Sequence, residues 1–423
     1  MKVFKFGGAS TNSYDRIKNL ATILENYKEE KILIVISAMG KITNALEKVV
    51  DAFYDGKNEE ALKLFEKIKN YHLNQLKYLV TLHWEKATNQ LNEFFTEIEW
   101  LLHDKPVKDY NYYYDQIVCS GELLSSTLIS YFLNEEKLPN HWIDVRDLLR
   151  TDDTFRDAKM DWDVSKKNVS EKLLPLFSKN NFVVTQGFIA STDENESTTL
   201  GREGSDYTAA IFADLLNAES VTIWKDVNGV MNADPKDFKD AITIEELSYK
   251  EVIEMAYYGA QVIHPKTIKP LQNKNIPLYV KSFIDLRVPG TVITRNQNHH
   301  LPPMIVYKRS QALVTLQTID FSFVEGKPVN LLYEILGELR LKPNLTQNAA
   351  ISIMICIDDI EEKTADLASK ASTVFDVQIQ KNLTLLTIRH FTPEYIELLS
   401  KNYEILLEQK TRETIQILIK QGD

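Results

Sequence analysis

Apolar positions in the first half of the chain follow two spacings that alternate along the sequence. Short continuous apolar runs are typical of strands that are covered on both faces. Such a run occurs at 32–36, and short, mainly apolar segments at 3–6, 182–185 and 221–224 are also expected to be strands. Elsewhere, apolar residues recur every three or four positions, which is typical of helices. Such stretches occur at about 14–27, through Leu46–Phe53 and at 205–217. The alternation predicts an α/β fold with a mainly parallel sheet and helices on both faces.

A long helical pattern interrupts this alternation. Residues 58–103 carry many charges and contain neither glycine nor proline. Such a stretch is too long for one ordinary globular helix, so it predicts either a helical insertion or a pair of antiparallel helices. We place its limits at about 56–105.

The pattern changes after Asn296–Pro303, a polar stretch with histidines and prolines that predicts a linker. Beyond it, strands are predicted at 312–316, 351–357, 377–379, 383–388, 403–408 and 414–419. Helices are predicted around 331–336, at 361–373 and at 393–400. This is strand–helix–strand–strand about twice, which predicts two small α+β units. The domains are therefore expected at 1–295 and 304–423.

Composition narrows the class of protein. The 423 residues suggest two to three domains, and a net charge of −11 argues against nucleic acid as the main partner. The cysteines, Cys119 and Cys356, are expected to be buried thiols rather than a disulfide. The N-terminus lacks the apolar core of a signal peptide, and the longest apolar runs are too short to span a bilayer. We expect a cytoplasmic protein without a membrane partner.

The segment Thr198–Ala210 carries the most informative chemistry. Gly201 and Gly204 bracket an arginine and a glutamate, and a Ser-Asp pair then begins an apolar helix pattern. Ser or Asp at such a junction is an N-cap signal, and a helix start attracts anions. The segment fits a small anionic substrate presented to a phosphate donor, and it fits equally a capped helix with two loop glycines.

Four other segments allow similar double interpretations. In Lys5–Ser10, a Gly-Gly turn follows a strand without Walker spacing, and it is either a phosphate-binding turn or only a turn. Ser37–Asn44 follows the next strand, where α/β sheets bind ligands, or it caps a helix. Glu122 either complements a helix dipole or accepts from a substrate ammonium. Trp224–Lys236 is either a nucleotide loop or an Asx-turn loop.

Together and in this order, the segments resemble the aspartokinase branch of the amino acid kinase family. Lys5–Ser10 is similar to its K-F-G-G-T-S opening, Thr198–Ala210 to T-T-L-G-R-G-G-S-D-Y-T-A-A, and Trp224–Lys236 to W-T-D-V-x-G-I-Y-T-x-D-P-R. Tyr258–Pro265 is similar to F-G-A-K-V-L-H-P. The resemblance is strong over residues 1–293. It implies a three-layer α/β/α amino acid kinase domain followed by two ferredoxin-like ACT domains.

The resemblance implies an aspartate kinase, which transfers the ATP γ-phosphoryl group to the β-carboxylate of L-aspartate. The product, 4-phospho-L-aspartate, would begin lysine, threonine and methionine biosynthesis. A carboxylate is ionised at pH 7, so the reaction needs no general base. Mg²⁺ would be carried mainly by the nucleotide phosphates, with no protein metal ligand. The alternatives are a sister kinase acting on glutamate, another carboxylate or a nucleoside monophosphate, and a non-catalytic amino-acid sensor.

The resemblance also implies roles for individual residues. The catalytic residues would be Lys5 and Asp206. Aspartate would be bound by Ser37, Thr43, Glu122, Phe188, Arg202 and Ser205. ATP would be bound by Lys5, Phe6, Gly7, Gly8, Lys225, Asp226, Met231, Lys236 and Gln261.

Several positions depart from the family pattern. Glu203 replaces a glycine, and its charge either pairs with Arg202 or turns outward. Ala9 replaces Thr, Met231 replaces Tyr, and Gln261 replaces Lys, a lost charge that Lys225 in place of Thr would compensate. The ACT region differs more, so inhibition by lysine or threonine is a hypothesis. A homodimer or higher homo-oligomer is expected, and no fused homoserine dehydrogenase is expected after Asp423.

Overall fold

The computed structural model describes residues 1–260, 263–296 and 300–421, which form two compact units. The first unit consists of Met1–Val230, Thr243–Ile253 and the described part of Gln261–Asn298. The second consists of Met231–Ile242, Glu254–Ala260 and the described part of His299–Asp423. Part of the predicted linker, 297–299, lies outside the described residues.

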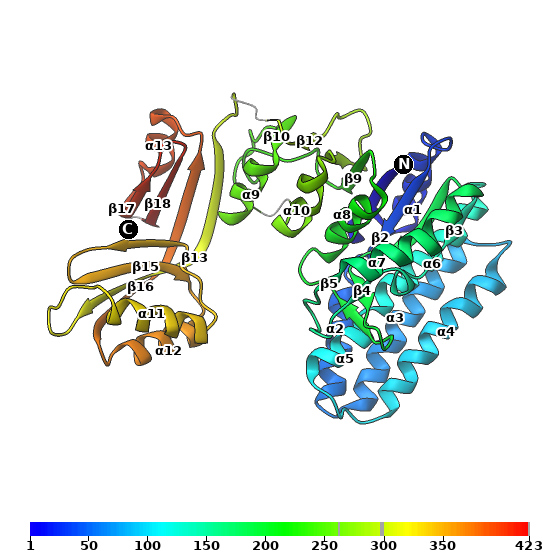
Figure 1. Ribbon diagram of the computed structural model, residues 1–423, viewed down its shortest axis with the longest axis horizontal. Helices are drawn as coiled ribbons and strands as arrows, with labels where there is room; N and C mark the ends of the chain where they lie inside the picture. Colours follow the sequence, from blue (N-terminus) through cyan, green and yellow to red (C-terminus); the bar gives the residue numbers. More distant parts are fainter. Residues whose placement is uncertain (261–262, 297–299, 422–423) are drawn as a thin grey trace. The chain divides into compact units, whose positions relative to one another are not determined.

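The first unit is built on an eight-stranded sheet with the order β10-β12-β11-β9-β1-β2-β6-β3 (Figure 1). Its strands are β1 (Lys2–Phe6), β2 (Ile32–Ile36), β3 (Asn140–Trp142), β6 (Phe182–Gln186), β9 (Ser220–Lys225), β10 (Glu246–Ser248), β11 (Leu278–Ser282) and β12 (Thr291–Thr294). Neighbouring strands are parallel except β11 and β12. All five residues of β2 are buried, as its apolar run predicts for a strand covered on both faces.

Helices cover both faces of this sheet. The apolar sides of α1 (Tyr14–Glu25), α2 (Ile42–Tyr54) and α6 (Ser120–Glu135) share one core cluster with Phe4 and Phe6 of β1. Helix α8 (Gly204–Leu216) contacts β1 and β9 outside that cluster and packs beside α10 (Pro265–Lys274). The α/β/α arrangement is confirmed. The four strands and three helices predicted in this half of the chain are present, within a few residues at most ends.

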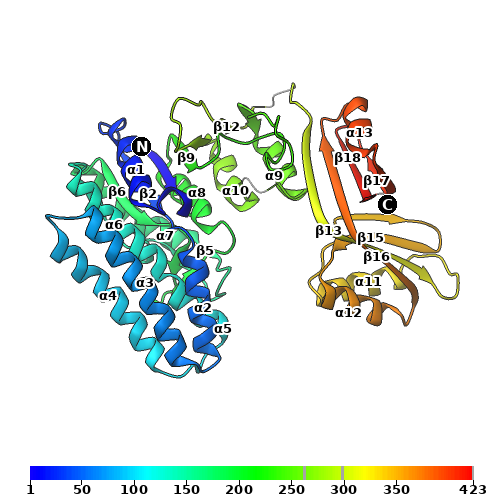
Figure 2. The same cartoon turned by 180° about the vertical axis from the view of Figure 1, so that it is seen from behind.

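The interrupting helical pattern forms two helices, α3 (Asn58–Leu79) and α4 (Trp84–His103), joined by residues 80–83. They lie side by side in opposite directions (Figure 2), with the Phe65 and Phe95 rings 6.2 Å apart between them. Helix α3 packs on α2, and α4 packs on α6. The predicted antiparallel pair is thus confirmed, and α5 (Tyr110–Val118) follows it.

A small sheet that the sequence pattern did not predict lies in the first unit. Its order is β5 (Met160–Asp161), β4 (Arg150–Thr151), β7 (Ile189–Ser191), β8 (Ser197–Thr199). The remaining elements of the first unit are short helical turns at Gly8–Ser10, Val145–Asp147, Val169–Leu173 and Leu174–Ser178, and α7 (Trp162–Asn168). Helix α9 (Tyr249–Tyr257) begins in the first unit and ends in the second. Strand β8 leads directly into the Gly201–Gly204 loop.

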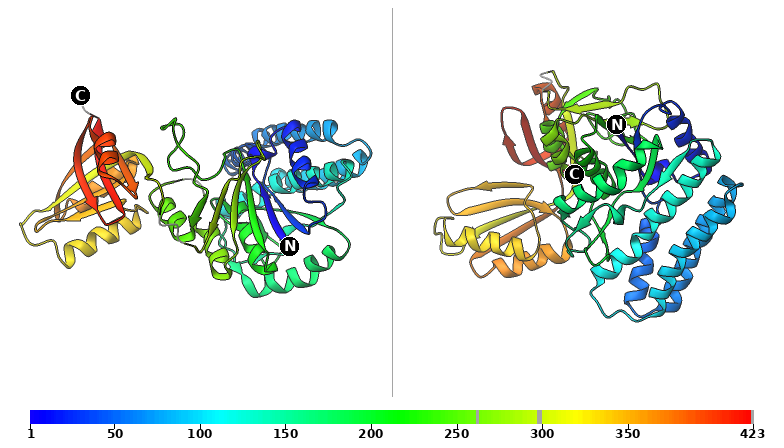
Figure 3. Two further views of the ribbon diagram at one scale, coloured as in Figure 1. Left: turned by 90° about the horizontal axis from the view of Figure 1, so that it is seen from above. Right: turned by 45° about the vertical axis from the view of Figure 1, so that its right-hand side comes forward.

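The second unit is built on a six-stranded antiparallel sheet with the order β14-β15-β13-β16-β18-β17 (Figure 3). Its strands are β13 (Met304–Thr318), β14 (Leu345–Asn348), β15 (Ser352–Asp358), β16 (Phe375–Arg389), β17 (Tyr403–Lys410) and β18 (Thr414–Gln421). Its helices are α11 (Lys327–Glu338), α12 (Glu361–Ala371) and α13 (Pro393–Ser400). The apolar sides of α11 and α12 share one core cluster, and that of α13 belongs to another.

Two predicted strands of this unit, 377–379 and 383–388, are one strand, β16. The pattern divides there because Lys381 and Asn382 are polar, and Asn382 has a φ of 59°. The pairing of β16 with β13 also shifts register between Lys308 and Leu313. Extra residues at such a bulge break the alternation of apolar and polar positions without ending a strand.

Both cysteines are free and buried, as predicted. Burial raises the pKa of each thiol to about 12, so both are protonated at neutral pH. Within the described part of the chain, no helix is both long and apolar enough to cross a membrane.

Candidate functional site

A cavity of about 550 Å³ opens in the first unit where β1, β2, β6 and β9 end. Loops after these strands and the start of α8 form its walls. The residues that line it are Lys5, Gly8, Ser37, Ala38, Gly40, Thr43, Tyr114, Glu122, Arg156, Phe188, Thr199, Gly201, Arg202, Glu203, Gly204, Ser205, Asp206 and Lys225. This is the edge at which parallel α/β sheets bind ligands.

One buried carboxylate holds two lysines at this edge. Asp206, in the first turn of α8, lies with Oδ1 2.6 Å from Nζ of Lys5 and Oδ2 3.4 Å from Nζ of Lys225. Burial would raise the pKa of Asp206, but the two lysines outweigh it and hold that pKa below its ordinary value. The three side chains therefore form a fixed charged cluster with one net positive charge.

The turn after β1 lies against the turn after β2, and only glycine fits between them. A Cβ on Gly8 would lie 2.7 Å from the carbonyl oxygen of Ala38 and 2.9 Å from that of Gly40. The amide of Gly40 also donates to the carbonyl of Gly8 at 3.0 Å. The absence of a side chain at Gly8 therefore lets both turns border the cavity closely.

Four buried polar atoms of lining residues have no hydrogen-bond partner among residues 1–260, 263–296 and 300–421. They are Oγ of Ser37, Oε2 of Glu122, Oε2 of Glu203 and Oδ1 of Asp206, the last of which forms the ion pair with Lys5. The other oxygen of Glu122 accepts from the amide of Ala38 at 3.3 Å. Buried polar atoms without partners are costly, so their convergence on one cavity indicates a polar ligand.

Burial strongly affects Glu122. Desolvation raises its pKa to about 8, although the Ala38 amide and the charge of Lys5 act in the opposite direction. The carboxyl group is therefore mostly neutral at pH 7 in the empty cavity, and a cation bound beside it would favour its ionised form.

The Gly201–Gly204 loop differs from its predicted form at the helix start. Glu203, not Ser205 or Asp206, precedes the first residue of α8, and no side chain caps that end. The predicted Ser or Asp N-cap is therefore wrong. Glu203 has a φ of 53°, in the left-handed region, which explains why glycine suits this position. Arg202 is exposed, and no ion pair joins it to Glu203 within the residues that the structure describes.

The six residues predicted to bind the acceptor all line the cavity: Ser37, Thr43, Glu122, Phe188, Arg202 and Ser205. Lys5, Gly8 and Lys225 of the nucleotide set also line it, whereas Phe6, Gly7 and Asp226 do not. The side chain of Phe6 instead stacks on Trp224 in the core. Met231 and Lys236 belong to the second unit, and Gln261 lies outside the described residues.

Two lining residues lie outside every segment that the sequence singled out: Tyr114 and Arg156. Arg156 and Thr199 are both held by Asp115 of α5, whose carboxylate accepts from their amides at 2.9 and 2.8 Å. Burial raises the pKa of Asp115 to about 6, which these donors moderate. Arg156 lies in a turn-rich segment with no periodic pattern, so the sequence carried no signal for it.

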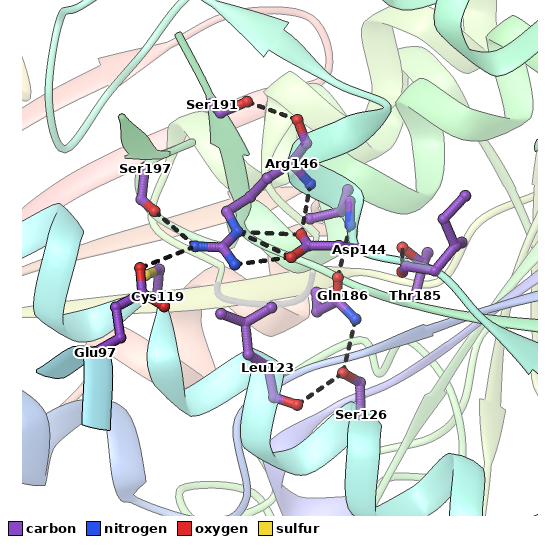
Figure 4. A network of polar contacts seen from close by, with 12 residues as sticks. Glu97, Cys119, Leu123, Ser126, Asp144, Arg146, Thr185, Gln186, Ser191 and Ser197 are labelled. Carbon is purple, nitrogen blue, oxygen red and sulfur yellow. Dashed lines mark hydrogen bonds and ion pairs between the residues drawn. The ribbon is translucent and has the colours of Figure 1, made fainter. Parts of the chain in front are cut away.

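A second polar network connects the elements that adjoin β8 (Figure 4). The Arg146 guanidinium forms a fork with the carboxylate of Asp144, with a shortest contact of 2.8 Å, and donates to Oγ of Ser197 at 3.2 Å. The side chain of Gln186 accepts from the amide of Val145 at 2.7 Å and donates to Oγ of Ser126 at 2.8 Å. The network ties the end of β6 and the start of β8 to α6, and so holds the elements that carry the lining loops.

In the described part of the chain, no three His, Cys, Asp or Glu side chains come together in a way that could hold a metal ion. The cavity instead brings the lysines held by Asp206 together with the unpartnered oxygen atoms of Ser37, Glu122 and Glu203. The lysines suit phosphate groups, and the oxygen atoms suit the ammonium and hydrogen-bonding groups of a small polar molecule.

Comparisons with known proteins identify the family of the chain. The model of the "Amino acid kinase family" matches residues 1–282. Lysine-sensitive aspartokinase 3 of Escherichia coli K12 is 30% identical over 394 residues, which cover 91% of this chain and 86% of that protein. A bifunctional aspartokinase/homoserine dehydrogenase of Zea mays chloroplasts is 30% identical over 378 residues, 87% of this chain but only 41% of that protein.

A solved structure is similar over nearly the whole chain. The structure of E. coli aspartokinase III in complex with aspartate and ADP, in the R-state, has a TM-score of 0.80 and 28% identity. The similarity covers 99% of this chain and 96% of that one.

Proposed function

The chain belongs to the amino acid kinase family and, within it, to the aspartokinases, and from this membership we propose what each part of its cavity does. The protein is an ATP-dependent kinase with a carboxylate acceptor. We infer that it transfers the γ-phosphoryl group of ATP to the β-carboxylate of L-aspartate. The observation that carries this proposal is one cavity that is lined both by a lysine–aspartate cluster and by the unpartnered buried oxygens of Ser37 and Glu122.

The acceptor lies at the end of the cavity near Glu122. The free oxygen of Glu122 accepts from the α-ammonium of aspartate, and the Arg202 guanidinium binds the α-carboxylate in bidentate fashion. The hydroxyl groups of Ser37, Thr43 and Ser205 hold the β-carboxylate, with the Phe188 ring beside it. In this arrangement the unpartnered atoms of Ser37 and Glu122 both gain partners.

The nucleotide phosphates lie at the other end, near Lys5 and Lys225. Both ammonium groups are already oriented by Asp206, so they stabilise charge on the phosphates without reorganising. Phe6, Gly7, Asp226, Met231, Lys236 and Gln261 remain predicted members of the nucleotide site. Mg²⁺ brought by ATP would neutralise phosphate charge when bound, and it would be held mainly by the phosphates rather than by side chains of the protein.

Transfer requires little covalent chemistry from the protein. A β-carboxylate oxygen of aspartate attacks the γ-phosphorus, and the bond from phosphorus to the β–γ bridging oxygen breaks. ADP leaves with that electron pair, and 4-phospho-L-aspartate forms. Because the nucleophile is already ionised at pH 7, positioning and charge stabilisation supply the catalysis.

An ADP-release assay with a panel of acceptors tests the proposal. With ATP and Mg²⁺, we expect turnover with L-aspartate and turnover at least about a hundredfold lower with L-glutamate or a nucleoside monophosphate, because the donors are placed for one acceptor. Turnover with the nucleotide acceptor would indicate a sister kinase. Aspartate binding without turnover on any acceptor would indicate a sensor.

The second unit has the antiparallel sheet and helices of ACT domains, and we propose that residues 304–423 regulate the activity of residues 1–295. By analogy with the lysine-sensitive relative, lysine is the first candidate effector, and threonine is the alternative. We also propose that the protein is a homodimer or a higher homo-oligomer. Titration of the activity with each amino acid tests the first part of this proposal. Flat curves with both amino acids would refute it.

The proposed role of Glu122 predicts a specific pH dependence. Below about pH 8 the free cavity holds Glu122 neutral, so kcat/KM for aspartate should rise as pH increases from 6 to 8. The Glu122→Gln variant cannot ionise, so it should lose this rise and show a KM for aspartate roughly 10- to 100-fold higher. Steady-state kinetics from pH 6 to 9 measure both effects, and an unchanged slope in the variant would contradict the assignment.

Stability provides an independent measure of the same group. The pKa of Glu122 is raised from an ordinary value of 4.5 to about 8 on folding, so the unfolded chain loses its proton first. Between these two pH values, Glu122 therefore lowers the stability of the wild type as pH rises. The thermal unfolding temperature of Glu122→Gln should therefore fall less than that of the wild type as pH rises over this range.

A further inference from the structure

Two residues of opposite charge line the cavity in a strained backbone conformation. Arg156 has a φ of 70° and Glu203 a φ of 53°, both in the left-handed region that favours glycine. Residues other than glycine, asparagine and aspartate rarely adopt this conformation, and such strain concentrates at binding sites. Both positions therefore have an unfavourable backbone conformation, and both line the same cavity.

The segments that carry these residues run against each other. The amide of Ala158 donates to the carbonyl of Thr199 at 3.0 Å, and Asp115 accepts from the amides of both Arg156 and Thr199. A Cβ on Gly201 would lie 3.3 Å from the carbonyl oxygen of Arg156. Neighbouring backbone segments thus direct the side chains of Arg156 and Glu203 into one cavity.

The two side chains differ in exposure and in hydrogen bonding. The Arg156 guanidinium lies 4.3 Å from the centroid of the Tyr114 ring and is exposed. Oε2 of Glu203 is buried and has no hydrogen-bond partner among the residues that the structure describes. A buried carboxylate oxygen in this state requires a donor when the cavity is loaded.

The other cations of the cavity already have partners or assigned roles. Lys5 and Lys225 pair with Asp206, and Arg202 is assigned to the α-carboxylate of the acceptor. Arg156 offers five N–H donors in a planar fork, enough to meet two carboxylates at once.

We propose that Arg156 is a further acceptor-binding residue, whose guanidinium bridges the Glu203 carboxylate and a carboxylate of the bound amino acid. Glu203 is then its positioning residue, and the pair selects acceptors with two carboxylates. This role rests on the proposed function, and it adds a second arginine to the acceptor end of the cavity.

Kinetics of Arg156→Gln, Glu203→Gln and the double variant test the pair. Glutamine, like arginine and glutamate, is unbranched at Cβ, so each change keeps a similar backbone cost. Glu203→Gln removes the charge, and Arg156→Gln removes both the charge and the guanidinium fork. Arg156→Gln should raise KM for aspartate about 10- to 100-fold and change KM for ATP less than about twofold. Glu203→Gln should raise KM for aspartate roughly 3- to 10-fold alone and add nothing in the Arg156→Gln background.

Lys159→Gln is the matched control, because Lys159 is an exposed cation in the same segment that does not line the cavity. It should leave both KM values unchanged. An unaltered KM for aspartate in Arg156→Gln would overturn the proposal. It would also be overturned if the fold-increase in KM of the double variant equalled the product of the increases of the two single variants. A general loss of kcat with unchanged KM would do the same, because it would indicate a structural role.

Turnover of aspartate by the wild type distinguishes a failure of the Arg156–Glu203 proposal from a failure of the proposed function. If the wild type turns over aspartate, the function stands and the variants decide the inference. If it does not, calorimetric titration with L-aspartate replaces KM, and weaker binding by Arg156→Gln still supports the pair. Equal binding by wild type and variant, or no binding by either, overturns it.

Discussion

Replacement of Lys5 by alanine is expected to lower kcat about a thousandfold or more and to leave aspartate affinity within about threefold. The Nζ of Lys5 lies 2.6 Å from Asp206 at the end of β1, and its side chain is only 11% exposed. It is therefore a fixed positive charge, and its effect is largest when the transferred phosphoryl group spreads its negative charge in the transition state. The proposed aspartate site uses Glu122, Arg202 and hydroxyl groups rather than Lys5, so aspartate binding should change little.

Single-turnover kinetics measure the chemical step of Lys5→Ala, and calorimetric titration measures aspartate binding. Lys2→Ala is the matched control, because Lys2 lies on the same strand but pairs with Glu30 instead of lining the cavity. It should retain near-normal kcat. Near-normal turnover by Lys5→Ala would refute the assigned role.

The adjacent strands β9, β1, β2 and β6 of the first unit could be predicted because they are buried on both faces, whereas β3, β10, β11 and β12 of the same sheet were not predicted. Ile32–Ile36 has no polar position, so the run alone defines the strand and its limits. The small sheet beside it could not be predicted, since β4 and β5 contain two residues each, too few for any periodicity. In the second unit, Lys381 and Asn382 divided one long strand into two predicted ones, because the local bulge breaks the alternation of side chains.

In the candidate site too, some residues could be predicted from the local sequence, whereas others are placed only by tertiary contacts. Lys5, Arg202 and Asp206 lie in glycine-containing segments whose order along the chain identified them, and the fold brings all three to one cavity. Arg156 has no such segment, and only the contacts of Asp115 bring it there. The expected N-cap failed because Glu203 takes a left-handed conformation, which side-chain type alone did not predict.

Replacement of Asp206 by asparagine is expected to lower kcat roughly 100- to 1000-fold, although the substitution is nearly isosteric. Asp206 is the shared counter-charge of Lys5 and Lys225, at 2.6 and 3.4 Å. An amide cannot neutralise either ammonium, so the two lysines would repel each other and lose their fixed positions.

Control variants separate the loss of the Asp206 charge from a loss of folding stability. Asp214→Asn is the control, because Asp214 lies on the same helix and pairs with Lys274 outside the cavity. It should keep near-normal kcat. In the Asp206→Asn background, Lys225→Thr removes one of the two like charges and should recover part of the lost kcat. If Asp206→Asn turned over normally, or if Lys225→Thr only lowered kcat further in that background, Asp206 would not be the residue that positions Lys5.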